Sequence, residues 1–74
     1  MSPSEMEARG LGIIMLKRDR ALSSAGKTWI YKFELPERPS GDGRRQLTVM
    51  WHTPAGAWQT AARWAKRLRD GRLP

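Results

Sequence analysis

The sequence predicts an α+β fold, in which a three-stranded antiparallel β-sheet packs on one C-terminal α-helix. Apolar side chains recur at helical spacing from Thr53 to Arg69, whereas Thr28 to Leu35 and Arg44 to Trp51 alternate apolar and polar side chains as strands do. A chain of 74 residues also has room for only one small core. We therefore expect a single βββα domain over residues 11–74, preceded by a flexible tail over residues 1–10.

The predicted helix has one apolar and one polar side. Thr53 can cap its first amides, Pro54 suits the first helical position, and Gly71 can adopt the left-handed conformation that ends a helix. At about 100° per residue, the apolar side carries Ala57, Trp58, Ala61, Ala62, Trp64, Ala65 and Leu68. A single helix cannot bury two tryptophans by itself, so the strands must supply the surface that faces it.

Three strands are expected before the helix. The apolar run Leu11 to Lys17 predicts the first, and Ser23 to Gly26 predict a turn after it. In the second strand, the residues expected to face the helix are Trp29, Tyr31, Phe33 and Leu35. The loop over residues 36–43 contains two prolines and two glycines, which cannot continue a strand. The third strand should turn Leu47, Val49 and Trp51 towards the helix.

The opposite face of the sheet is expected to remain exposed. It would present Lys32, Glu34, Gln46, Thr48, Met50 and Lys17, flanked by Arg44 and Arg45 where the third strand begins. The four tryptophans could act as base-stacking platforms, but their alternation favours the core for Trp29, Trp51, Trp58 and Trp64.

The net charge of +7, from fourteen Lys and Arg residues against seven Asp and Glu, indicates a polyanionic partner. Nucleic acid is the first candidate and an acidic protein surface is the second, although the charge could also serve only to keep a small protein soluble. No run reaches the roughly 18 apolar residues of a membrane span. The simplest expectation is a cytoplasmic protein that does not use a membrane.

Enzymatic chemistry finds little support in the composition. The absence of cysteine excludes disulfides, thiolate zinc sites and thiol catalysis. His52 is the only histidine, and the sequence offers no second histidine or cysteine with which it could bind a metal. Glu34 and Glu37 do not form a credible catalytic pair. We expect no catalytic residue, no metal and no cofactor.

Three segments resemble the N-terminal arm-type DNA-binding domains of phage and transposon tyrosine integrases, and more distantly the plant ethylene-response DNA-binding domain. They are GKTWIYKFEL (Gly26 to Leu35), GRRQLTV (Gly43 to Val49) and TPAGAWQTAARWAKRL (Thr53 to Leu68). The resemblance covers roughly residues 13 to 69 and rests on the order and spacing of short motifs. One departure is Gly56, which stands where that family has a glutamate at the start of its helix.

The resemblance implies a sheet that enters the major groove of duplex DNA by its exposed face, with the helix behind it. Lys32 and Glu34 match the exposed middle strand of that family, and Arg44, Arg45 and Gln46 match the start of its hairpin. Basic residues on the outer side of the helix could contact phosphates or simply face solvent. The residues predicted to bind nucleic acid are Lys17, Lys32, Arg44, Arg45, Gln46, Thr48, Arg63 and Arg67.

Two functions are therefore expected from the sequence. The first is a small basic protein that binds duplex DNA, such as an accessory factor of a phage or mobile element. The second is a compact protein-interaction module, such as a phage-encoded inhibitor that presents arginines to an acidic host protein. Binding by counterion release depends steeply on salt, whereas a protein partner would be single and stereospecific.

Overall fold

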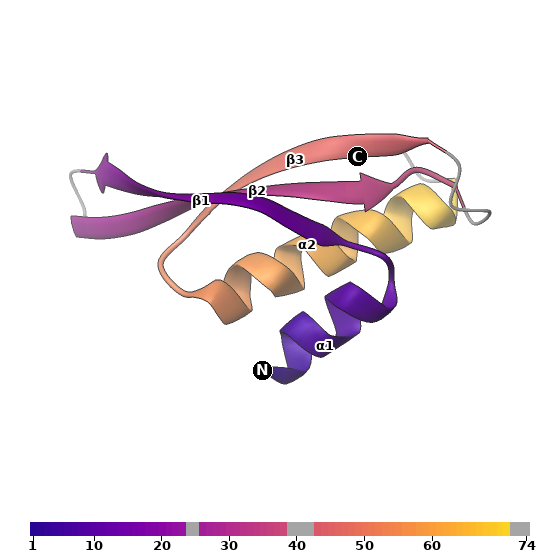
Figure 1. The fold of residues 1–74 in the computed structure, drawn as a ribbon, viewed down its shortest axis with the longest axis horizontal. Helices are drawn as coiled ribbons and strands as arrows, with labels where there is room; N and C mark the ends of the chain where they lie inside the picture. The colour runs from indigo at the N-terminus through magenta and orange to yellow at the C-terminus, as the bar shows by residue number, and fades with distance from the viewer. Residues whose placement is uncertain (24–25, 39–42, 72–74) are drawn as a thin grey trace.

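A computed structural model of the chain describes residues 1–23, 26–38 and 43–71. In chain order its elements are α1 (Pro3–Gly10), β1 (Ile14–Ser23), β2 (Gly26–Pro36), β3 (Arg44–Trp51) and α2 (Pro54–Arg69) (Figure 1). The strands form one antiparallel sheet in the order β1-β2-β3. This confirms the predicted α+β class, with a short N-terminal helix added to it.

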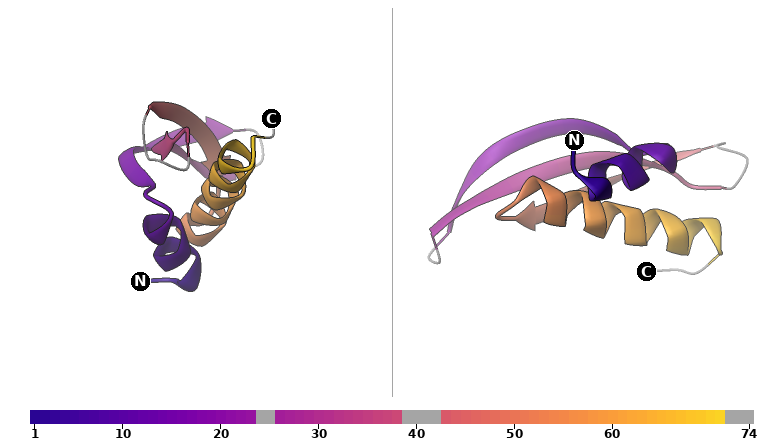
Figure 2. Two further views of the ribbon diagram at one scale, coloured as in Figure 1. Left: turned by 90° about the vertical axis from the view of Figure 1, so that its right-hand side faces the viewer. Right: turned by 90° about the horizontal axis from the view of Figure 1, so that it is seen from below.

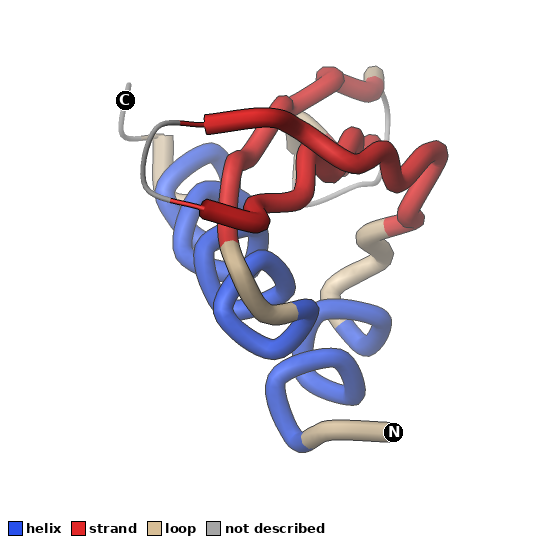
Figure 3. The backbone as a smooth tube through the Cα atoms, turned by 90° about the vertical axis from the view of Figure 1, so that its left-hand side faces the viewer, coloured by secondary structure: helices blue, strands red, loops and turns tan. Residues whose placement is uncertain are grey.

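Both helices lie on the same side of the sheet, and the other face is left uncovered by either of them (Figures 2 and 3). Helix α2 starts directly after β3 and runs back beneath the sheet, antiparallel to that strand (Figure 1). The β1–β2 hairpin extends past the beginning of α2. The face of the sheet on the helix side is therefore covered at one end only.

The core forms where the aromatic side of β2 meets the alanines of α2. Tyr31 and Phe33 are fully buried, and the Phe33 ring lies 4.9 Å from the ring of Trp58, centroid to centroid. The helix meets the sheet through small side chains, which allow close approach around one large indole. Besides these three residues the buried core contains Ala8, Ile13, Leu35, Val49, Ala57, Ala61, Ala62 and Ala65.

Helix α2 confirms the predicted boundaries. The Thr53 side chain accepts a hydrogen bond from the Gly56 amide at 3.2 Å, and Pro54 occupies the first turn. Gly71 has a φ of 74°, in the left-handed region that glycine adopts without strain after a helix. The capping residues therefore fix both ends of this element.

The segment predicted as a flexible tail, residues 1–10, contains helix α1. Ser2 accepts a hydrogen bond from the Glu5 amide, which caps α1, and Pro3 stands in its first turn. Ala8 is fully buried, and Lys66 of α2 forms an ion pair with Glu7 at 2.6 Å. The segment shows no long apolar periodicity, but its capping residues and this contact with α2 are sufficient to order a helix of two turns.

Strand β1 differs from the predicted first strand at both ends. Leu11 and Gly12 form the turn after α1, so the strand begins at Ile14 and continues through the basic cluster to Ser23. A register shift between Met15 and Lys17 marks a β-bulge. The centre of the predicted turn, residues 24–25, and residues 39–42 of the predicted loop lie outside the described residues.

The second and third strands agree with the prediction, except for one tryptophan and for Pro36, which was predicted in the loop but is the last residue of β2, opposite Arg44. Strand β3 has the predicted bounds, and β2 extends the predicted strand by a few residues. Trp29 and Trp64 are partly buried against the core, and Trp58 is buried. Trp51, which was expected in the core, is 42% exposed, because the sheet extends beyond the start of α2 at this point.

Candidate nucleic-acid interface

The outer face of the sheet brings three of the predicted binding residues into one row. The register pairs Lys17 with Lys32 and Lys32 with Thr48, so the three side chains lie side by side across the three strands. In the next row Glu34 lies beside Gln46. The bulge in β1 is what places Lys17, rather than Leu16, opposite Lys32.

Ion pairs neutralise part of this face. Lys17 pairs with Asp19 at 3.3 Å, and Arg44 forms an ion pair with Glu34. Arg44 also donates a hydrogen bond to the Gly12 carbonyl at 2.8 Å, which ties β3 to the turn before β1. Of the basic residues predicted on this face, only Lys32 is exposed and has no carboxylate partner among the described residues.

Arg45 lies on the other side of the sheet from Arg44, because neighbouring residues of a strand point to opposite faces. Its guanidinium pairs with Glu37 at 2.8 Å, just after β2. The two arginines that the sequence groups together are therefore separated by the sheet, and each is held by its own carboxylate.

The same pattern holds for every carboxylate in the described part of the chain. Each belongs to an ion pair with a lysine or arginine; these carboxylates are Glu5, Glu7, Asp19, Glu34, Glu37 and Asp70. The remaining cations whose side chains are described are exposed and have no such partner; they are Arg18, Arg20, Lys32, Arg38, Arg63 and Arg67. The positive charge of the protein is thus concentrated at positions that no acidic side chain offsets.

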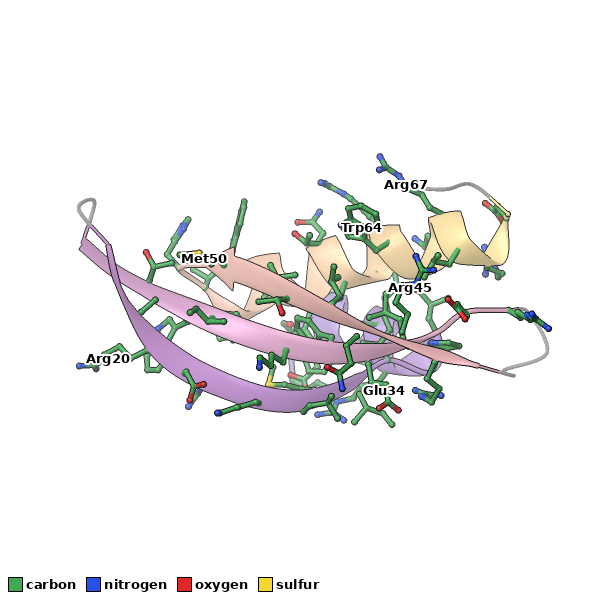
Figure 4. The ribbon with its side chains drawn as sticks, turned by 90° about the horizontal axis from the view of Figure 1, so that it is seen from above. Arg20, Glu34, Arg45, Met50, Trp64 and Arg67 are labelled. Atoms are coloured by element: carbon green, nitrogen blue, oxygen red, sulfur yellow. The ribbon has the colours of Figure 1, made fainter. Side chains whose placement is uncertain are left out.

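Two of these cations lie on the exposed side of α2. Arg63 and Arg67 are four residues apart, so they are neighbours on one side of the helix. The Arg67 guanidinium lies 5.7 Å from the Trp64 ring, and Figure 4 shows both residues on α2, to one side of the strands. The predicted helix residues therefore form a second basic region, separate from the outer face of the sheet.

Arg18 and Arg20 were not among the predicted binding residues. Because β1 continues to Ser23, they alternate with Lys17 and Asp19 and point to the helix side of the sheet. Their guanidinium carbons lie 4.9 and 5.4 Å from the centroid of the Trp29 ring. The signal that could have identified them is the spacing of Arg18 and Arg20, which puts both arginines on one face if a strand continues through the basic cluster.

Gly56 is explained by the position of Trp51. The Trp51 indole lies against the first turn of α2, and a Cβ atom at residue 56 would overlap its ring. The ring also lies nearly parallel to that of His52, at 19°, with 5.5 Å between centroids. The integrase domains that this sequence resembles have a glutamate at this position. Its side chain would overlap the Trp51 ring here.

Tyr31 has a buried hydroxyl to which no described residue offers a hydrogen bond. Burial raises the pKa of this hydroxyl, and the nearby positive charge of Arg18 acts in the opposite direction. The described residues contain no cluster of three or more potential metal-binding side chains. Within the same residues, no helix is both long enough and apolar enough to cross a membrane.

Comparisons with protein-family models, with curated proteins and with solved structures find no match to this chain.

Proposed function

We propose that this protein binds nucleic acid and that its unpaired cations contact the phosphates. The observation that carries the proposal is the distribution of charge: every described carboxylate is neutralised by a basic residue, while exposed arginines and a lysine remain without an acidic partner. A polyanion is the ligand that such an excess attracts, and release of its counterions supplies binding free energy.

Like charges also lie next to one another in three places. Lys17 of β1 lies directly opposite Lys32 of β2, and Arg63 and Arg67 are neighbours along α2. The guanidinium groups of Arg18 and Arg20 both lie over the indole ring of Trp29. Such pairs destabilise an isolated fold by a few tenths of a kcal/mol each. A phosphate backbone would relieve the repulsion, which supports a polyanionic ligand over a role in solubility alone.

Duplex DNA is the first ligand to test, and the outer face of the sheet is one surface that could meet it. Lys32, Gln46 and Thr48 are exposed there and can donate hydrogen bonds to phosphates or base edges. The ion pairs of Lys17 and Arg44 reduce the charge of this face. We therefore expect a larger electrostatic contribution from Arg63 and Arg67 than from the arginines at the start of β3.

A protein partner on the outer sheet face is the second candidate function. Ile14 and Met50 are 48% and 54% exposed, and both lie on this face beside the neutralised ion pairs. Exposed apolar side chains between paired charges are typical of protein interfaces rather than of surfaces that contact phosphates.

The test is the affinity for a duplex of arbitrary sequence, measured by fluorescence anisotropy at several salt concentrations. The proposal predicts that the logarithm of the binding constant falls linearly with the logarithm of the salt concentration. Absence of measurable binding at low salt, both to this duplex and to a single strand of the same length, would contradict it and favour the protein partner.

Two double variants that remove equal charge locate the contact. Arg63→Ala/Arg67→Ala should flatten the salt slope by about two units if each side chain contacts one phosphate. Arg44→Ala/Arg45→Ala should have a smaller effect, because Glu34 and Glu37 already neutralise those residues. Equal losses in both variants would indicate only a general attraction set by net charge.

A further inference from the structure

The last row of side chains that spans all three strands on the helix side of the sheet combines one arginine with two tryptophans. The register places Arg20 beside Trp29 and Trp29 beside Trp51, one residue from each strand. Helix α2 begins at Pro54 and runs away from this row, and its first turn, at Gly56, lies against Trp51. Figure 4 shows Arg20 near the projecting end of the hairpin, apart from Trp64 and Arg67.

Trp51 presents an aromatic surface to solvent. It is 42% exposed although tryptophans are usually well covered, and its ring is nearly parallel to that of the exposed His52. Contact with the backbone of Gly56 limits how the indole can move. Two exposed, nearly parallel rings beside the first turn of a helix offer a ring face on which another flat ring can stack.

Arg18 and Arg20 place positive charge next to this aromatic surface. Both guanidiniums stack on Trp29 and neither has a carboxylate partner in the described part of the chain. Stacking restrains a long side chain while leaving its N–H groups at the edge of the guanidinium free to donate. The paired N–H donors of a guanidinium match the spacing of phosphate oxygens.

We infer that the surface formed by Arg18, Arg20, Trp29, Trp51 and His52 binds an unpaired segment of nucleic acid, with a base stacked at Trp51 and phosphates at Arg18 and Arg20. The inference rests on the proposed function and adds the class of ligand. Bases in a duplex are covered by their neighbours, so only a single-stranded segment can offer a ring face. Alternating aromatic and basic side chains are the general means of binding such segments.

The test compares two single-stranded oligonucleotides with equal numbers of phosphates, an oligothymidine and an abasic strand of the same length. We expect the wild-type protein to bind the oligothymidine about tenfold more tightly, which is the order of one base stacked on an aromatic side chain. Trp51→Ala should abolish this difference and leave the affinity for the abasic strand unchanged. Arg18→Ala/Arg20→Ala should weaken binding to both strands and flatten the salt slope.

Met50→Ala is the matched control, since Met50 is next to Trp51 in β3, is comparably exposed and points to the other face. It should leave the preference for the oligothymidine intact. A readout that requires no variant is the indole N–H signal of Trp51 in the wild-type protein, which should shift on addition of the oligothymidine and not of the abasic strand.

Equal affinity of the wild type for the two strands, or a preference that persists in Trp51→Ala, would overturn the inference and leave the proposed function standing. A shift of the Trp51 signal by both strands alike would overturn it as well. If the wild type binds neither of the two strands nor the duplex, the proposed function itself is overturned.

Discussion

The two ends of the helix-side face of the sheet carry similar residues in different surroundings. At one end, Phe33 and Leu35 are buried under α2. At the other end, Trp29 is covered by two arginines and Trp51 is 42% exposed. The same alternation of apolar residues along β2 and β3 therefore builds a core at one end and a charged aromatic surface at the other.

The difference depends on where α2 starts rather than on the strands themselves. Period-two alternation determines which side of a sheet a residue faces, but not whether a second layer covers that position. Because α2 starts beside Trp51 and runs back towards Leu35, the row of Arg20, Trp29 and Trp51 lies at the first turn of the helix. A tryptophan in this pattern is a core residue under the helix and a surface residue beyond it.

The largest effect should come from breaking the covered end. Phe33→Ala and Trp58→Ala should each lower the free energy of unfolding by about 3–5 kcal/mol, because each removes a fully packed aromatic side chain. Denaturant unfolding measures this. Trp51→Ala is the comparison at the exposed end and should cost clearly less. Wild-type midpoints for both core variants would show that α2 does not pack on the sheet.

An intermediate effect is expected where the two ends meet, at Gly56. Alanine favours a helix by about 1 kcal/mol over glycine, but here its methyl group would overlap the Trp51 indole. We expect Gly56→Ala to destabilise the fold by about 1–3 kcal/mol. In a Trp51→Ala background the same change should stabilise it. A double-mutant cycle by urea unfolding tests this, and additive effects would contradict the contact.

The smallest effect concerns Tyr31, whose buried hydroxyl has no hydrogen-bond partner among the described residues. Tyr31→Phe should raise the free energy of unfolding at neutral pH by about 1 kcal/mol, since it removes a buried polar group without leaving a large cavity. A loss of stability in urea unfolding would instead indicate that the hydroxyl makes a favourable interaction.

The same variant has a signature at high pH. Burial raises the pKa of the Tyr31 hydroxyl above its ordinary value of 10.0, with Arg18 opposing. The unfolded chain therefore releases this proton at a lower pH than the folded protein, so this contribution to stability is present below pH 10.0 and declines above it. Tyr31→Phe should lose less stability between neutral pH and pH values above 10.0 than the wild type does. Parallel curves would contradict this assignment.

The elements with complete local signals could be predicted from the sequence. Helix α2 has a cap, a proline, a left-handed glycine and an apolar stripe, and all of them agree with its observed bounds. Helix α1 has caps but too short a pattern, so its burial of Ala8 against α2 could not be anticipated. The bulge at Leu16 likewise depends on pairing with β2, which local periodicity does not contain.

The candidate site depended on pairings between distant residues. Lys32 and Thr48 lie on the face that the alternation predicted. The ion pairs of Glu34 with Arg44 and of Glu37 with Arg45 form only because β2 and β3 pair in this register. Arg18 and Arg20 gain a common partner, Trp29, by the same means. Composition gives the excess of positive charge, whereas the identity of the unpaired cations comes from the fold.

The most direct measurement follows the arginine side-chain Nε–H signals of the protein by NMR while nucleic acid is added at low salt. If unpaired cations form the binding surface, Arg18, Arg20, Arg63 and Arg67 should shift most, and the ion-paired Arg9, Arg44 and Arg45 should shift least. The largest shifts at Arg44 and Arg45, with none at the unpaired arginines, would contradict this assignment of the binding surface.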